Sequence, residues 1–333
     1  MRGRRLTVAG LALATTLLLS GCAEAGSLVN RTGIDLGLQQ LTSELEAIPS
    51  VATVTPTSTL NGDYSYSVDV RVVVDVLVEG DVVSILHAVA ATFEAAPFTS
   101  TRALSFGLTA SDGSAFTPYY PLDISAHELD NEIHYWIALA AAYGGPLDMG
   151  LYGYPDDYTG PEKYLRNISA DDERRATDWD AVRAVPDSST AHRSWNLSGL
   201  GFEEAWPPDA VLELRDSLAA IVIHDEGNLA LTSYAIDLIG VSYFSPLLED
   251  PAMPATAASW PEVLAAVSLI VGSGFPLADF SYTGYDTVAG FVHLGECGGE
   301  VQSAAGDDAL WEALAASTIA LPAGSGAGYC SNA

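Results

Sequence analysis

The stretch YSYSVDVRVVVDVLV, residues 64–78, decides the fold because valine recurs in it at every second position from 68 to 76. Asp69, Arg71, Val73 and Asp75 occupy the positions between these valines. Successive side chains of a β-strand point to opposite faces, so one face of this strand is predicted to be buried and the other mostly polar. This pattern is typical of an antiparallel sheet that helices cover on one side.

The flanking segments extend this sheet. Residues 51–59 are predicted to form a neighbouring strand, and residues 34–48 carry leucines at helical spacing. After the strand, Asp81 is expected to cap a helix that Pro97 ends. With a further strand at residues 102–110, the succession helix, strand, strand, helix, strand is similar to the ferredoxin-like plan without its first strand.

A capping box and a glycine stop delimit the next predicted helix. Ser125 and Glu128 have the three-residue spacing in which each side chain bonds the backbone amide of the other. Gly144-Gly145-Pro146 cannot continue a helix, and residues 147–154 are then predicted to form a strand.

The same arrangement recurs along the chain. Helix-to-strand junctions are predicted at intervals of 40 to 49 residues, and proline, which lacks the amide hydrogen that a helix needs, stands at six of the seven. The junctions are Pro49, Pro97, Pro146, Pro186, Gly227, Pro276 and Pro322. Ser259 and Glu262 repeat the capping-box spacing, so residues 259–295 are predicted to repeat the helix, strand and strand of residues 125–168.

These patterns predict an α+β fold in which helices pack on antiparallel sheet and helix–strand–strand units are partly duplicated. Residues 34–170 are assigned to the first copy and residues 209–333 to the second. Residues 171–208 are predicted to be a solvated linker, because the run Asp171-Asp172-Glu173-Arg174-Arg175 is strongly charged.

The beginning of the chain has the pattern of an export signal. Arg2, Arg4 and Arg5 precede the apolar run Leu6–Leu19, which is shorter than the roughly 20 residues that span a bilayer. The run ends in Leu19-Ser20-Gly21-Cys22, which resembles the bacterial lipobox. The resemblance implies that residues 1–21 are a signal peptide, that Cys22 is diacylated, and that residues 22–33 are a lipidated tether. The alternative is an ordinary signal peptide with a chance cysteine, and the export route, general secretory or twin-arginine, is left open.

Composition bears on source, compartment and partners. Lys163 is the only lysine, a bias that resembles the proteins of GC-rich actinobacteria and implies a location on the outer face of the cytoplasmic membrane. The formal net charge of −30 opposes binding to nucleic acid. In an oxidising compartment Cys297 and Cys330 are expected to form a disulfide. The alternative, a thiolate metal site, needs four ligands and has only His293 nearby.

Three groups of residues are candidates for catalysis or metal binding. His127 and His134 share one side of a helix with Asn131, but they are about 10.5 Å apart along its axis, too far for one ion. Residues 224–228 place a histidine beside two carboxylates, which is the placement expected of a general base. The alternative is that this segment is a plain turn between a helix and a strand. Asp156-Asp157 with Glu162 lacks the spacing of a calcium loop. We therefore predict no catalytic residue, metal or cofactor.

The remaining candidate is aromatic. Tyr152, Tyr154 and Tyr158, with Asp156 and Asp157 between them, are predicted to form a partner surface, because tyrosine gives contact area at little entropic cost. The alternative is that these rings pack beneath the helices. The leading hypothesis is a non-enzymatic lipoprotein that binds a protein, wall polymer or solute. The rival is a cell-envelope hydrolase whose carboxylates meet only in the fold.

Overall fold

A computed structural model describes residues 31–61, 65–101, 103–120, 124–154, 164–170, 177–189, 191–203, 205–223, 228–235, 238–284 and 288–331. The chain divides into two compact units. Unit 1 comprises the residues up to Leu165 together with Pro186–Ala191, and unit 2 comprises Arg166–Val185 with His192–Ala333.

Unit 1 begins with a helix over residues 31–45. Its further elements, in chain order, are β1 (Val51–Leu60), β2 (Tyr66–Val74), α2 (Glu79–Glu94), the short η1 (Phe98–Ser100), β3 (Ala103–Ala110), β4 (Ala115–Tyr120), α3 (Ala126–Tyr143) and β5 (Asp148–Gly153). The strand β6 (Tyr164–Ser169) contains the boundary between the units.

Unit 2 continues the same succession. Its elements are α4 (Trp179–Arg183), β7 (His192–Leu197), β8 (Leu200–Glu203), α5 (Asp209–Ala219), β9 (Asn228–Ala235), β10 (Leu238–Phe244), η2 (Pro254–Thr256), α6 (Trp260–Ser273), β11 (Leu277–Thr283), β12 (Val288–Gly295), β13 (Glu300–Gln302), α7 (Asp307–Ala315), β14 (Gly326–Ala327) and β15 (Tyr329–Ser331). Within the described ranges, no helix combines the length and the apolar character needed to cross a membrane.

Two kinds of strand pairing alternate. The strands of one hairpin are antiparallel, as in β1 with β2, β3 with β4, β7 with β8, β9 with β10, and β11 with β12. Strands joined through a helix are parallel, as in β2 with β3, β4 with β5, β8 with β9, and β10 with β11. A short turn forces antiparallel pairing, whereas a crossover helix returns the chain in the same direction. The α+β class is confirmed, and the crossovers make the sheet mixed.

The predicted succession of helix, strand and strand is confirmed. Each described junction proline follows a helix and precedes a strand, and α3, β5 and β6 have the same order as α6, β11 and β12. Over residues 34–110 the elements also follow in the expected order, and β2 pairs directly with β3. In a complete ferredoxin-like sheet the first strand lies between these two, and this is the strand that the predicted plan lacks.

The core of unit 1 lies between α2 and the sheet. Val68, Val70, Val72 and Val74 of β2 are at most 1% exposed, as their alternation predicts. Opposite them, α2 buries Val82, Ile85, Leu86, Val89 and Phe93. Burying one such side chain contributes about 1.5 to 3 kcal/mol, so this layer fixes which face of the sheet is covered.

The limits of α3 follow from local sequence. Ser125 Oγ accepts the amide of Glu128, and a carboxylate oxygen of Glu128 accepts the amide of Ser125, so the predicted capping box is confirmed. Gly144 ends the helix with φ 71°, a left-handed conformation that glycine adopts without strain.

Two predicted caps are wrong. Asp81 lies inside α2, which begins after Val78 without a side-chain cap, and its carboxylate accepts the amide of Ser50 at 3.3 Å. Ser259 and Glu262 form no capping box. Ser259 instead hydrogen-bonds Tyr282 of β11, and Glu262 accepts the hydroxyl of Tyr243 of β10. Both polar side chains are buried, so they find their partners on the sheet and not on the helix itself.

Part of the predicted linker is structured. Residues 177–203 contain α4, β7 and β8, and Trp195, Leu197, Leu200 and Phe202 are buried. Strands this short carry few alternations, so the adjacent charged run, which lies outside the described residues, dominated the prediction. In unit 2, Cys297 and Cys330 are joined by a disulfide with Cα atoms 5.7 Å apart.

Candidate functional site

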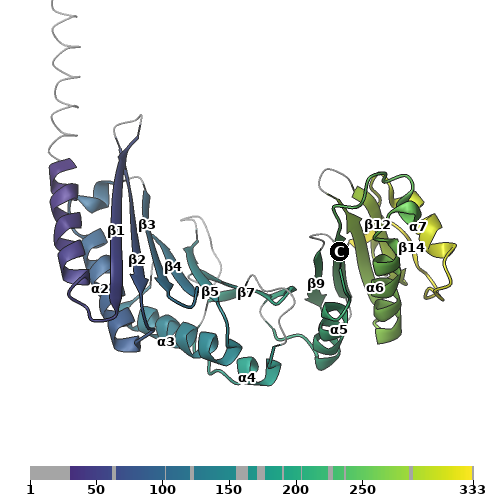
Figure 1. The fold of residues 1–333 in the computed structure, drawn as a ribbon, viewed down its shortest axis with the longest axis horizontal. Helices are drawn as coiled ribbons and strands as arrows, with labels where there is room; N and C mark the ends of the chain where they lie inside the picture. The colour runs from purple at the N-terminus through teal and green to yellow at the C-terminus, as the bar shows by residue number, and fades with distance from the viewer. Residues whose placement is uncertain are drawn as a thin grey trace, which may run out of the picture. The chain divides into compact units, whose positions relative to one another are not determined.

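One face of the sheet in unit 1 is covered by helices, and among the described residues the opposite face carries none (Figure 1). We call this second face the open face; it carries Asp69, Arg71 and Val73 of β2 and the residues aligned with them on the neighbouring strands. Because β2 alternates strictly, its valines are committed to the core and its charged residues to the open face.

Strand register aligns five polar side chains across the open face. Thr57, Asp69, Ser105, Tyr119 and Tyr152 lie directly opposite one another on β1 to β5. We call this set the Asp69 row. Neighbouring strands are about 4.8 Å apart, so the row extends over about 19 Å.

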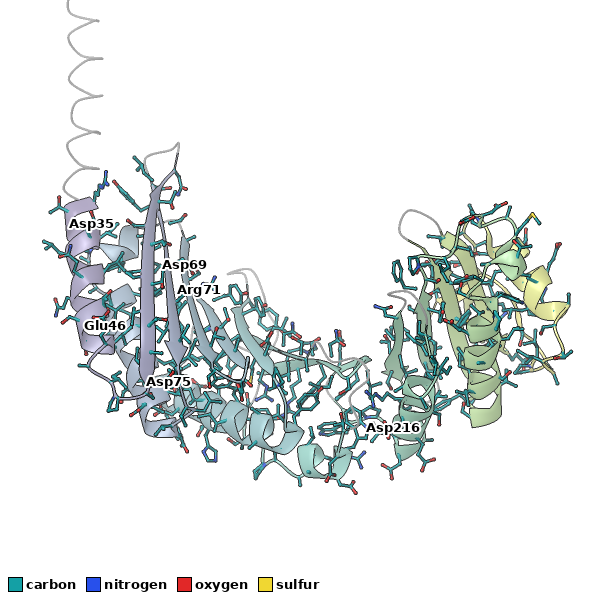
Figure 2. All side chains as sticks on the ribbon, in the orientation of Figure 1. Asp35, Glu46, Asp69, Arg71, Asp75 and Asp216 are labelled. Carbon is teal, nitrogen blue, oxygen red and sulfur yellow. A yellow bond between two sulfur atoms is a disulfide. The ribbon has the colours of Figure 1, made fainter. Side chains whose placement is uncertain are left out.

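Asp69 is the polar centre of the row. Its carboxylate accepts a hydrogen bond from Ser105 Oγ at 2.5 Å. It also accepts one from Arg71 Nε at 2.9 Å, and both residues of this ion pair are labelled in Figure 2. The guanidinium group of Arg71 lies over Gly107 of β3, where a Cβ atom would come within 2.4 Å of it. An exposed ion pair of this kind contributes only about 0 to 1 kcal/mol of stability. The ion pair between Asp69 and Arg71 therefore fixes the positions of two charged groups on the open face and adds little to the stability of the fold.

A pair of tyrosines forms the other end of the row. The rings of Tyr119 and Tyr152 stack with centroids 4.3 Å apart and an interplanar angle of 14°. Tyr119 is 41% exposed, and the ring of Tyr152 lies against Gly150, where a Cβ atom would come within 2.7 Å of it. The glycine lets the ring lie close to the sheet, so the two rings form a low platform.

This combination suits a flat ligand that is rich in hydroxyl groups. Aromatic rings provide apolar contact for the C–H faces of sugar rings, and their phenol groups can hydrogen-bond. Asp69 accepts and Arg71 donates hydrogen bonds at the same level of the surface. Charge-assisted hydrogen bonds of this kind are the stronger ones.

The structure describes two of the three tyrosines of the predicted partner surface and the neighbouring Tyr120 and Tyr164. Tyr152 is in the row, and Tyr154, which directly follows β5, is partly exposed. Tyr164 is buried and donates its hydroxyl to Glu132 at 2.6 Å. Tyr120 packs edge-on against Phe93 of α2, and burial, followed by the nearby Glu94, raises its pKa. Asp156, Asp157 and Tyr158 lie outside the described residues.

Of the candidate histidines that the structure describes, one contacts a carboxylate and the other is exposed. His134 Nδ1 lies 3.1 Å from Glu79 Oε1, which joins α3 to α2, and His127 is exposed. The part of the chain that the structure describes contains no group of three or more His, Cys, Asp or Glu residues suited to a metal ion. Glu162 and residues 224–227 lie outside it.

A scan against protein-family models and searches of curated proteins and of solved structures gave no match to this chain. The candidate site therefore depends on geometry alone. Sequence reasoning found Tyr152 and the polar positions of β2, but it missed that Ser105 and Tyr119 align with them. Only the registers of β2 with β3 and of β3 with β4 bring these residues together.

Proposed function

We propose that the chain is a lipid-anchored extracytoplasmic module that binds a hydroxyl-rich wall polymer on the open face of unit 1. The observation that carries the proposal is the Asp69 row, in which a stacked tyrosine pair and the Asp69 carboxylate lie along one line across five strands, with Arg71 paired to Asp69 beside that line. An extended line of contacts matches a chain of sugar rings better than it matches a compact solute.

Binding is favoured over hydrolysis by the shape of this surface. A glycosidase needs two carboxylates about 5 to 9.5 Å apart on either side of the scissile bond. On the open face, Asp69 instead neighbours the guanidinium group of Arg71, the hydroxyl of Ser105 and the two phenol rings of the row. The buried carboxylates Glu132 and Glu262 each accept a tyrosine hydroxyl and so serve the core.

Removing either ring of the platform is expected to weaken polymer binding. Tyr119→Ala and Tyr152→Ala should each reduce affinity for washed wall material by about 1 to 2 kcal/mol, roughly 5- to 30-fold. Co-sedimentation with the wall material measures the affinity, and soluble wall oligosaccharides serve as competitors.

Val73→Ala is the matched control, because it truncates an exposed side chain on the same face outside the row. Its binding and the melting temperatures of all three variants should stay close to those of the unmodified protein. Unchanged binding by both tyrosine variants would refute the proposed site. A large fall in their melting temperature would mean that the rings stabilise the fold instead.

The anchor has a separate test. Cys22→Ala should move the protein from the membrane fraction to the soluble fraction, or leave an uncleaved precursor, because two or three acyl chains supply durable attachment at roughly 0.8 kcal/mol per buried methylene. Fractionation and metabolic labelling with a fatty acid measure this. Equal labelling and equal membrane attachment of the variant would overturn the assignment of Cys22.

A further inference from the structure

A groove lies in unit 2, on the sheet face that carries Gly240, Ser242, Asp279 and Ser281. These residues of β10 and β11 form its floor, and the cavity has a volume of about 290 Å³. Three aromatic residues from different strands form its walls, namely Tyr234, Phe291 and Tyr329. We call this the aromatic groove.

The wall residues are held by contacts with the floor, with each other and with Gln302. Tyr234 leans over Gly240, where a Cβ atom would come within 2.6 Å of its ring, and it is 63% exposed. The rings of Phe291 and Tyr329 lie 5.4 Å apart at 59°. Tyr329 donates its hydroxyl to Gln302, so the ring itself is left to face a ligand.

The floor carries a carboxylate among these rings. Asp279 Oδ1 accepts the amide of Cys330 at 3.0 Å, and Ser281 Oγ donates to Ser242 Oγ at 3.0 Å beside it. Burial raises the pKa of Asp279, while the Cys330 amide and the nearby His293 act in the opposite direction. A cation in the groove would compensate a carboxylate that is only partly solvated.

Charges around the groove favour a positive ligand. None of the nine lining residues is lysine or arginine, and the chain as a whole has a formal charge of −30. His293 stands opposite Asp279 on β12, and its ring nitrogens lie 3.3 and 3.1 Å from the carbonyl oxygens of Gly328 and Gly324. Either ring nitrogen can therefore donate to a backbone carbonyl oxygen, depending on the tautomer, and besides Asp279 the titratable groups that line the groove are the phenols of Tyr234 and Tyr329.

We propose that the aromatic groove binds an organic ammonium group, with Tyr234, Phe291 and Tyr329 around the cation and Asp279 as its counter-ion. A cation over the faces of aromatic rings is attracted by their quadrupoles, most strongly where water is excluded. The volume is just below the roughly 300 to 1,000 Å³ of typical small-molecule sites, which suits one headgroup rather than a polymer. This site is separate from the Asp69 row, so the two proposals stand or fall independently.

The probes are choline and its neutral analogue 3,3-dimethylbutan-1-ol. The two molecules have the same shape, but the alcohol has an uncharged carbon atom in place of the quaternary nitrogen. Isothermal titration of the full chain at low salt should give affinity for choline about tenfold or more above that for the alcohol. Asp279→Asn keeps the oxygen that accepts the Cys330 amide but removes the charge, and should weaken choline binding about tenfold or more. Tyr234→Ala should weaken it about three- to tenfold.

Asp308→Asn is the matched control, because it removes the same charge from an exposed position on α7. It should change choline affinity by less than about twofold. Affinity for the unmodified protein should also fall as the pH is lowered through the raised pKa of Asp279, since protonation removes the counter-ion. Equal binding of the two probes, or equal losses in Asp279→Asn and Asp308→Asn, would overturn the proposal.

Discussion

Trp136→Ala is expected to cost unit 1 about 3 to 5 kcal/mol of its free energy of unfolding. Trp136 lies on α3, is 0% exposed, and packs with its ring 5.4 Å from that of Phe116 on β4. Its indole nitrogen donates to the carbonyl oxygen of Leu147 at 3.1 Å. Alanine would leave a cavity and also a buried carbonyl group without that donor.

Chemical denaturation followed by circular dichroism would measure this loss. Because the chain has two compact units, the transitions of unit 1 and unit 2 must be fitted separately. Tyr119→Ala is the control, since it removes a large ring from the open face of the same unit. A loss below about 1 kcal/mol for Trp136→Ala would contradict the packing of α3 on the sheet.

Removing the disulfide is expected to have the second largest effect. The paired variant Cys297→Ser with Cys330→Ser should lose about 3 to 4 kcal/mol in unit 2, because the bond closes a loop across a sequence separation of 33 residues. A reductant should lower the unfolding midpoint of the unmodified protein and leave that of the paired variant unchanged. If the reductant shifted both equally, or neither, the disulfide would not be the cause.

Local patterns predicted the elements well. The valines of β2, the capping box at Ser125 and the prolines at helix-to-strand junctions are decided by residues close together in the chain, so they could be predicted directly. The same local pattern failed at Ser259 and Glu262, because these side chains hydrogen-bond Tyr282 and Tyr243, which belong to strands of the sheet.

The sites depend on distant residues. Asp69 and Ser105 are 36 residues apart and meet only through the register of two parallel strands. The aromatic groove gathers Tyr234, Phe291 and Tyr329 from three strands, and its wall needs the pairing of β13 with β15. Nothing in the spacing of these residues along the chain distinguishes them from other strand aromatics.

The disulfide between Cys297 and Cys330 has a consequence for when the protein can act. Tyr329, a wall of the groove, directly precedes Cys330, and the Cys330 amide holds the floor residue Asp279. Tyr329 and Cys330 follow the strands of the floor in the chain, so they are synthesised later. The disulfide forms only in an oxidising compartment. Before the disulfide forms, the groove of a newly made chain would therefore be incomplete, and it would not bind the amines of the cytoplasm. Under the proposed export, oxidation outside the cytoplasm would be the step that completes the groove.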